Sequence, residues 1–233
     1  MVESEQNFGD REYYEHVKSE GASERFLAWI RDGIYRDFIA ACSPNESSKI
    51  LDVGVSQLIN RAANVLERLY PYQERITAAG LGSGEEFRRA FPKVRYVQIM
   101  PSERLPFNDS EFDIATSNAV LEHVGGIEQQ KFFLSELLRI AARVYIIVPS
   151  RYFPVEHHTA IPFLHFTDAT FRLACAATGN KKWSDESNLR LMTKRRLIEL
   201  VPTGVKASIG YTGLQLGPFS SNLYLLASRQ RPA

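Results

Sequence analysis

The sequence predicts an α/β fold with a doubly wound, mostly parallel sheet that ends in an antiparallel hairpin. Short apolar runs alternate with helical patterns, and these strand-like runs lie at 49–54, 74–81, 94–100, 111–118 and 142–149. Parallel strands need crossover connections, which the helical stretches between them supply. Near the C-terminus, two further strand-like runs at 206–214 and 220–228 are separated only by a loop, which predicts the hairpin.

A helical segment precedes the predicted sheet. Its apolar residues recur at every fourth position and form one face: Phe26, Ile30, Ile34 and Phe38, with Leu27 and Ile39 beside them. Ser23 is the expected N-cap of this helix. The turn-rich sequence SPNESS at 43–48 ends the segment. We therefore divide the chain into an N-terminal helical extension, 1–48, and one α/β domain, 49–233.

Further helices are expected after several of the strands. The helix at 58–69 has an apolar face that contains Leu58, Ala62, Val65 and Leu69. Glu67 falls on the opposite, polar face of that helix. The other helices are expected at 128–141, 168–179 and 193–201.

The composition indicates a globular protein that acts on a small molecule. The 233 residues are 44% hydrophobic and 24% charged, which is enough to close one sizeable core. The formal net charge is +1, so no overall field favours nucleic acid or an anionic membrane as a partner. The sequence does not fix the oligomeric state, and a homodimer is one option.

The sequence also predicts a cytoplasmic protein. The first twenty residues are too polar and acidic for a signal peptide, and no apolar run approaches the ~20 residues of a membrane span. The two cysteines, Cys42 and Cys175, lack the spacing of a zinc knuckle or a disulfide framework. Both are expected to be buried thiols in a reducing compartment.

The stretch KILDVGVSQ at 49–57 places Asp52 and Gly54 at the end of the first predicted strand. Ligands of open parallel sheets bind outside the carboxyl ends of the strands, where the strand order reverses. A glycine at this point lets the backbone approach a ligand closely. A plain tight turn without a ligand explains the same tripeptide equally well when it is taken alone.

A longer match comes from LPFNDSEFDIATSNAVLEHVGG at 105–126. It resembles the small-molecule methyltransferases of the class I S-adenosylmethionine-dependent superfamily, and the resemblance covers about 49–150 and, more loosely, the chain to 228. The segment RYFPVEHHTAIPFLHF at 151–166 is similar to one branch of that superfamily. The resemblance implies the seven-stranded class I methyltransferase fold and S-adenosylmethionine as cofactor.

The chain departs from the cofactor motifs of that superfamily at three points. Ser56 and Leu58 replace the second and third glycines of the first motif, 80–82 lacks the acid that binds the ribose, and Met100 stands where an acid commonly binds adenine. Each lost charge-assisted contact could cost about 1–3 kcal/mol. The cofactor contacts that the resemblance implies are Asp52, Gly54, Ser56, Leu81, Ser102, Glu103 and Asn118.

Ionisable and aromatic residues follow the fourth and fifth predicted strands. We expect His123 and His158 to be catalytic, because a general base for a hydroxyl acceptor needs a pKa near neutrality. The expected substrate contacts are Glu122, Tyr152, Glu156 and His157. Glu122 and His123 could alternatively just begin a helix. No metal site is expected, since His157, His158, His165 and Glu156 match no established zinc spacing.

The resulting hypothesis is an enzyme that transfers a methyl group from S-adenosylmethionine to a small molecule, such as a hydroxyl group of a sugar or related metabolite. The alternative is a methyltransferase-like binding or regulatory protein that has lost turnover, which the altered cofactor motifs favour. Dinucleotide-dependent redox chemistry is excluded because no G-x-G-x-x-G follows a strand. The signature of amine-directed DNA methyltransferases is also absent, so nucleic acid is not the expected substrate.

Overall fold

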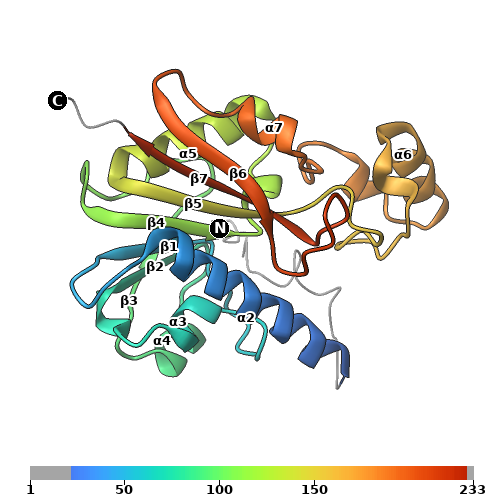
Figure 1. The fold of residues 1–233 in the computed structure, drawn as a ribbon. Helices are drawn as coiled ribbons and strands as arrows, with labels where there is room; N and C mark the ends of the chain where they lie inside the picture. Colours follow the sequence, from blue (N-terminus) through green and yellow to red (C-terminus); the bar gives the residue numbers. More distant parts are fainter. Residues whose placement is uncertain (1–21, 230–233) are drawn as a thin grey trace, which may run out of the picture.

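The computed structural model describes residues 22–229, and within them one seven-stranded sheet has the order β3-β2-β1-β4-β5-β7-β6 (Figure 1). The first five strands pair in parallel, and β7 is antiparallel to both β5 and β6. The predicted fold class and the C-terminal hairpin are therefore confirmed. The strands are β1 (Ile50–Val53), β2 (Ile76–Gly80), β3 (Arg95–Gln98), β4 (Phe112–Asn118), β5 (Ala141–Pro149), β6 (Val205–Thr212) and β7 (Asn222–Arg229).

Helices cover both faces of this sheet. The described α-helices are α2 (Ala22–Cys42), α3 (Val65–Leu69), α4 (Glu85–Ala90), α5 (Ile127–Ile140), α6 (Asp168–Ala177) and α7 (Lys194–Ile198). Short 3₁₀ turns are η1 (Gln73–Arg75), η2 (Leu121–His123), η3 (Leu164–Phe166) and η4 (Lys181–Ser184). The helices predicted near 128–141, 168–179 and 193–201 are confirmed as α5, α6 and α7, the last of these shorter than expected.

Alternate residues of the central strands point to opposite faces, as a period of two requires. In β5, Val144 and Ile146 belong to the core under α5 and α7, whereas Tyr145 and Ile147 belong to the core under α2, α3 and α4. All four of these residues are buried. The near-continuous apolar run of β5 thus reflects a strand that is covered on both sides.

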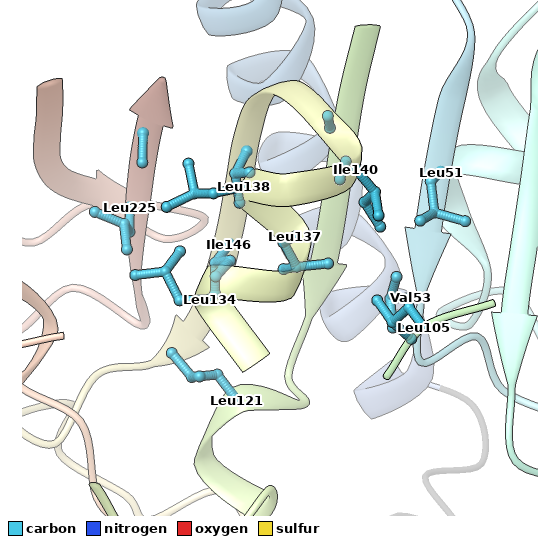
Figure 2. Packing of buried hydrophobic residues seen from close by; sticks show 14 of the residues in the cluster. Leu51, Val53, Leu105, Leu121, Leu134, Leu137, Leu138, Ile140, Ile146 and Leu225 are labelled. Atoms are coloured by element: carbon cyan, nitrogen blue, oxygen red, sulfur yellow. The ribbon is translucent and has the colours of Figure 1, made fainter. Parts of the chain in front are cut away.

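The largest core lies between α5 and the sheet. Leu134, Leu137 and Leu138 of α5 pack beside Ile146 of β5 and Leu225 of β7 (Figure 2). The helix is amphipathic at a period of 3.6 residues, so these leucines fall on the face that meets the sheet. This packing fixes the β4–β5 crossover, whose strand ends carry the candidate site.

Helix α2 packs against the other face of the sheet. Phe38 contacts the ring of Tyr145 edge-on at a centroid separation of 5.6 Å. Arg143 of β5 donates a hydrogen bond of 2.7 Å to the Cys42 carbonyl, and Thr212 of β6 donates one of 2.6 Å to Asp37. The N-terminal helix is therefore joined to the sheet by apolar and polar contacts. The division of the chain at residue 48 remains a prediction.

Two details of the α2 prediction were wrong. Ile30, Ile34 and Phe38 are buried as expected, but Phe26 is 50% exposed. Figure 1 shows the N-terminal end of α2 extending away from the sheet, and Phe26 stacks on Trp29, which is also exposed. Ser23 lies inside the first turn of the helix rather than before it, because the helix begins at Ala22.

The segment after β1 is irregular, so the predicted helix at 58–69 was wrong in its first half. Only Val65–Leu69 is helical, and Leu58 is exposed instead of packing inward. The side chain of Asn64 bonds the N–H and the C=O of Ser56, each at 2.9 Å, and Asn60 accepts from two backbone N–H groups. Asparagine side chains thus take the backbone groups that a helix would need.

The segment between β5 and α7 forms a small lobe beside the sheet, which contains α6 (Figure 1). Its own apolar cluster includes Phe171, Cys175 and Trp183. Cys42 and Cys175 are both free and buried, as predicted. Among the helices of residues 22–229, none combines the length and apolar character that crossing a bilayer requires.

We expect Leu137→Ala to lower the free energy of unfolding by about 2–5 kcal/mol, because it leaves a cavity in the fully buried core under α5. Phe132→Ala in the same helix is the matched control, since Phe132 is 42% exposed and its loss should cost less than about 1 kcal/mol. Urea denaturation monitored by circular dichroism measures both. An equal decrease in the free energy of unfolding of the two variants would contradict this packing of α5 on the sheet.

Candidate active site

Two groups of polar side chains lie at the carboxyl ends of the central strands. The first, which we call the switch-point cluster, consists of Asp52 at the end of β1, Glu67 of α3 and Asn118 at the end of β4. Strand β1 lies between β2 and β4, so the strand order reverses there. That reversal is the position at which open α/β sheets bind ligands. The second group is the histidine cluster, which is described below.

Gly54 follows β1 and adopts a left-handed backbone with φ +93°. A Cβ atom at this position would overlap Cγ2 of Val120, which belongs to the loop after β4. The Gly54 N–H donates to the Ala79 carbonyl at 2.7 Å, which fixes the loop against β2. Only glycine fits this backbone and this close approach.

Glu67 is fully buried, and apart from the neighbouring Asp52 carboxyl group its carboxyl oxygens have no hydrogen-bond partner among residues 22–229. Burial and the nearby Asp52 carboxylate raise the pKa of Glu67 well above its ordinary value. Burial likewise raises the pKa of Asp52 to about 7. The sequence placed Glu67 on a polar helix face, which was wrong because the shortened α3 turns this residue inward.

Asn118 adds a further acceptor to the switch-point cluster. Its Oδ1 atom is buried and has no hydrogen-bond partner within the described part of the chain. The preceding residue, Ser117, donates a hydrogen bond of 2.8 Å to the Val53 carbonyl and holds β4 against β1. The cluster therefore offers more acceptors than donors, which favours a ligand that carries N–H groups or positive charge.

The other predicted cofactor residues lie apart from these acceptors. Ser56 is buried, and its backbone N–H and C=O are both bonded to Asn64. Leu81 packs against the core under α5. Ser102 and Glu103 are exposed in the loop after β3, and Ser102 has φ +59°. The structure thus brings Asp52, Gly54 and Asn118 to the switch point but does not gather all seven predicted residues.

Polar side chains of the protein itself cover the end of β2. Tyr96 donates a hydrogen bond of 2.7 Å to the Gly82 carbonyl, and Gln57 donates one of 2.9 Å to the Tyr96 hydroxyl. A Cβ atom on Gly80 would lie 2.7 Å from that hydroxyl. The nearest acids along the chain, Glu85 and Glu86, are exposed on α4. No carboxylate of the described residues replaces the acid that the sequence lacks here.

The histidine cluster consists of Glu122 and His123 of η2 together with Glu156 and His158 of the loop after β5. The Nδ1 atom of His123 lies 2.8 Å from the Asn188 carbonyl, which only accepts, so Nδ1 carries the proton. The Nε2 atoms of His123 and His158 are 2.9 Å apart. The Nδ1 atom of His158 lies 2.7 Å from Glu156 Oε1.

The electrostatic environment assigns a charge state to each residue of the hydrogen-bonded series Glu156–His158–His123. Burial disfavours a charged His158, but the hydrogen bond and the charge of Glu156 outweigh this effect and raise the pKa of His158. Burial and the charge of His158 lower the pKa of His123 to about 4. Burial opposes ionisation of Glu156, yet the His158 contacts lower its pKa to about 2. Near neutral pH, Glu156 is therefore a carboxylate, His158 is an imidazolium and His123 is neutral.

Glu122 is the unusual member, because it is 1% exposed and neither carboxyl oxygen has a hydrogen-bond partner among the described residues. Burial raises its pKa to about 7, although the charges of His158 and of Arg31 on α2 oppose this. Its Oε1 atom lies 4.0 Å from Nε2 of His123. Ligand atoms of Glu122, His123 and His158 all lie within 4.8 Å of one another.

A small cavity adjoins the histidine cluster, with room for about one water molecule. Glu122, Glu156 and His157 line it, so three of the four predicted substrate residues come together. Tyr152, the fourth, is 43% exposed and is not part of this lining. The Nε2 atom of His157 has no hydrogen-bond partner in the described range.

The possibility that Glu122 and His123 only begin a helix is excluded, since they form an isolated 3₁₀ turn.

Sequence reasoning missed two residues that position the histidines. The buried ring of Trp183 packs against His158 at a centroid distance of 5.0 Å and against His123 at 5.8 Å. The Asn188 carbonyl fixes the His123 tautomer. Both residues come from the lobe that contains α6, about sixty positions from His123 along the chain. No local pattern links them, so only the tertiary structure reveals the contact.

Comparison with known proteins agrees with the fold. A family model described as a methyltransferase domain matches residues 54–144. The sequence has no significant match among proteins of curated function. The fold is that of the class I S-adenosylmethionine-dependent methyltransferases, and the segment 54–144 resembles their methyltransferase domain. The segment that matches this superfamily contains Gly54, Glu67, Asn118 and the Glu122–His123 pair.

Solved methyltransferases share the fold at low sequence identity. A methyltransferase from Methanosarcina mazei is 15% identical with a TM-score of 0.56, and the match covers 83% of this chain and 98% of that one. Magnesium protoporphyrin IX methyltransferase from Synechocystis, solved with bound SAH, is 13% identical with a TM-score of 0.52, covering 89% and 84%. At such identities the likeness concerns the architecture alone.

The switch-point cluster fits the amino acid part of S-adenosylmethionine better than it fits the ribose. The amino acid part of the cofactor carries an ammonium and a sulfonium group, and the Asp52 and Glu67 carboxyl groups, together with the unpartnered Oδ1 of Asn118, suit positive charge. The ribose finds no carboxylate at the end of β2, where Gln57 and Tyr96 lie instead. The residues therefore fit the cationic end of the cofactor.

We expect Gly54→Ala to be more destabilising than Gly204→Ala. Both glycines have positive φ, but a Cβ atom on Gly204 would meet nothing within 4 Å, so that variant isolates the backbone cost of about 1–2 kcal/mol. Overlap with Val120 should add about 1–3 kcal/mol at Gly54. Chemical denaturation of both variants measures the difference. Equal losses would show that Val120 does not close on Gly54.

The free energy of unfolding should depend on pH through Glu67. Its folded-state pKa lies above the unfolded value of 4.5, so its contribution is most favourable at low pH and is lost as the pH rises. We therefore expect Glu67→Gln to become more stable relative to wild type between about pH 5 and pH 8. Denaturation curves at both pH values measure this change.

Glu136→Gln is the matched control for Glu67, because Glu136 is a buried carboxylate with a partner. Its hydrogen bond with Arg139 holds its pKa below the ordinary value. Its stabilising contribution is therefore fully present above the unfolded pKa and is lost only in more acidic solution. The control should be destabilised by a similar amount at both pH values. A Glu67→Gln variant that behaved in the same way would refute the unpartnered carboxylate.

Proposed function

We propose that the protein transfers a methyl group from S-adenosylmethionine to a hydroxyl group of a small molecule, such as a sugar or a related metabolite. The observation that carries this proposal is the hydrogen-bonded series from Glu156 through His158 to His123, which follows the ends of β4 and β5 at the same edge of the sheet as the switch-point cluster. The two clusters together would supply a binding site for the cationic cofactor and a group that can accept a proton. The cytoplasm is the compartment that the free, buried cysteines favour.

On the cofactor side, Asp52, Glu67 and Asn118 would hold the amino acid part of S-adenosylmethionine. Each offers an acceptor that lacks a described donor, or a carboxyl group whose pKa is raised by burial. A cationic ligand lowers such a pKa and favours the carboxylate, so binding and ionisation are coupled. When bound, the cofactor supplies a methyl group that is already activated by the sulfonium charge.

On the acceptor side, His123 would take the proton of the hydroxyl group. Its Nδ1–H donates to the Asn188 carbonyl, so Nε2 carries the lone pair, which accepts from Nε2 of His158 until an acceptor hydroxyl takes that place. The lowered pKa keeps the ring neutral near pH 7, although it makes His123 a weaker base than the near-neutral one that the sequence predicts. His158 would remain the charged partner of Glu156. Positioning of the two reactants supplies the rest of the catalysis, because the methyl donor needs no further activation.

A second candidate function is binding or regulation without turnover. The specific observation in its favour is the polar contact of Gln57 with Tyr96 over the end of β2, where a ribose would need a carboxylate. Loss of that charge-assisted contact weakens binding by about 1.5–3 kcal/mol. The two candidates differ in whether the folded protein binds S-adenosylmethionine and turns it over.

Calorimetric titration with S-adenosylmethionine and S-adenosylhomocysteine tests the cofactor assignment. We expect the wild type to bind both, and Asp52→Asn to weaken binding by about 10–100-fold, the worth of one charge-assisted hydrogen bond. Glu85→Gln, which removes an exposed acid near the end of β2, should change affinity by less than about twofold. A folded wild type that bound neither compound at millimolar concentration would overturn the proposal.

Formation of S-adenosylhomocysteine in the presence of a panel of hydroxylated metabolites tests the acceptor assignment. We expect His123→Gln to reduce turnover by about 10²–10⁴-fold, as is usual for loss of a general base, without changing cofactor affinity. His165→Gln is the matched control, because it also removes a buried histidine near the cavity. Full activity of His123→Gln on an acceptor that the wild type methylates would remove the assignment of the base.

A further inference from the structure

The histidine cluster also has the geometry of a metal site without its metal. We propose that Glu122, His123 and His158 bind one divalent transition-metal ion, with zinc as the first choice. Two imidazoles and one carboxylate are an established ligand set for catalytic zinc, which keeps a fourth position open. This inference rests on the cluster geometry and does not depend on the methyltransferase proposal.

Both imidazoles are oriented as metal ligands usually are. A metal-binding histidine almost always donates its other ring N–H to a carboxylate or a backbone carbonyl, which fixes the tautomer and the ring orientation. His158 has this contact with Glu156 at 2.7 Å, and His123 has it with the Asn188 carbonyl at 2.8 Å. Both Nε2 atoms are thereby directed to the same point.

The third ligand is Glu122, whose burial needs an explanation. A buried carboxylate without partners costs several kcal/mol unless it is protonated or meets a cation. Among the described residues neither oxygen of Glu122 has a hydrogen-bond partner, and Oε1 lies 4.0 Å from Nε2 of His123. A metal ion at this point would satisfy the carboxylate that the protein leaves unpartnered.

The distances agree with this assignment after small shifts. Two nitrogen ligands at 2.0–2.1 Å from a tetrahedral zinc ion lie roughly 3.3 Å apart. The two Nε2 atoms are 2.9 Å apart, so they need to separate by only a few tenths of an ångström. Glu122 must move further, because its Oε1 atom is 4.0 Å from Nε2 of His123 and the three ligand atoms lie within 4.8 Å of one another.

Without a metal, the same contact requires a buried imidazolium. One of the two Nε2 atoms must then carry a proton, and His158, whose Nδ1–H already faces Glu156, becomes charged. A metal ion replaces that proton and leaves both rings neutral. In the metal-bound form both Nε2 atoms would be ligands, so the base role proposed above for His123 applies to the metal-free form.

Zinc titration of the chelator-treated full chain tests the site, with calorimetry for affinity and elemental analysis for stoichiometry. We expect one zinc ion per chain in the wild type. Glu122→Gln and His158→Gln should each weaken binding by at least about 100-fold, and Glu156→Gln by about 10–100-fold, the usual effect of a residue that orients a ligand. His165→Gln, which removes a buried histidine outside the three ligands, should retain full affinity.

Absorption spectra of the cobalt-substituted protein distinguish the loss of a metal ligand from the loss of folding in the variants. His123→Cys should keep the metal and add a thiolate-to-cobalt charge-transfer band, which only a direct ligand can produce. A folded wild type that binds no stoichiometric zinc would overturn the proposal, and so would unchanged affinity in Glu122→Gln and His158→Gln. S-adenosylhomocysteine binding is measured separately without zinc, so failure of the metal site leaves the cofactor assignment intact.

Discussion

The burial of carboxyl groups without partners is the constraint on which the site depends. Glu67 and Glu122 are both almost completely inaccessible, and in the described part of the chain no basic or amide side chain satisfies their oxygens, Glu67 having only the Asp52 carboxyl group beside it. An unsatisfied buried polar group costs about 1–3 kcal/mol, and a charged one costs more. The folded protein tolerates this cost at two points, and both lie at the carboxyl ends of the central strands. A positively charged ligand at each point would offset it.

The rest of the fold keeps these two groups in place. Helix α5 packs on β4 and β5 through a leucine-rich face, and α2 packs on the opposite face through Phe38 and Tyr145. Because β5 is covered on both sides, the loop that carries Glu156 and His158 begins from a rigid strand. The lobe that contains α6 adds Trp183 against the two imidazoles. Rigidity of this kind holds a costly polar arrangement that a mobile loop would release.

Much of the fold follows from local patterns in the sequence. The alternation of strands and helices and the C-terminal hairpin were predicted correctly, because each depends on periodicity within a short stretch. The helix at 58–69 was wrong in its first half, since Asn60 and Asn64 bond the backbone in place of a helix. Burial of Glu67 could not be predicted, because it follows from that shortened helix and from the approach to Asp52.

The candidate site was predictable as a set of residues but not as an arrangement. His123 and His158 were identified from their positions after consecutive strands, yet their contact joins residues 35 positions apart. The roles of Trp183 and Asn188 depend on the packing of the second half of the lobe, residues 167–193, in which the sequence shows no motif. The unpartnered state of Glu122 is equally invisible in the sequence, where an acid before a histidine is typical of an exposed turn.

The most direct test of this account is a carbon NMR titration of the glutamate carboxyl groups in the ligand-free protein. The account predicts that Glu122 titrates near pH 7 and Glu67 well above 4.5, whereas Glu156 titrates near pH 2. Addition of zinc should remove the Glu122 transition, and addition of S-adenosylhomocysteine should lower that of Glu67. Ordinary titration of Glu67 and Glu122 near pH 4.5 in the ligand-free protein would contradict the account.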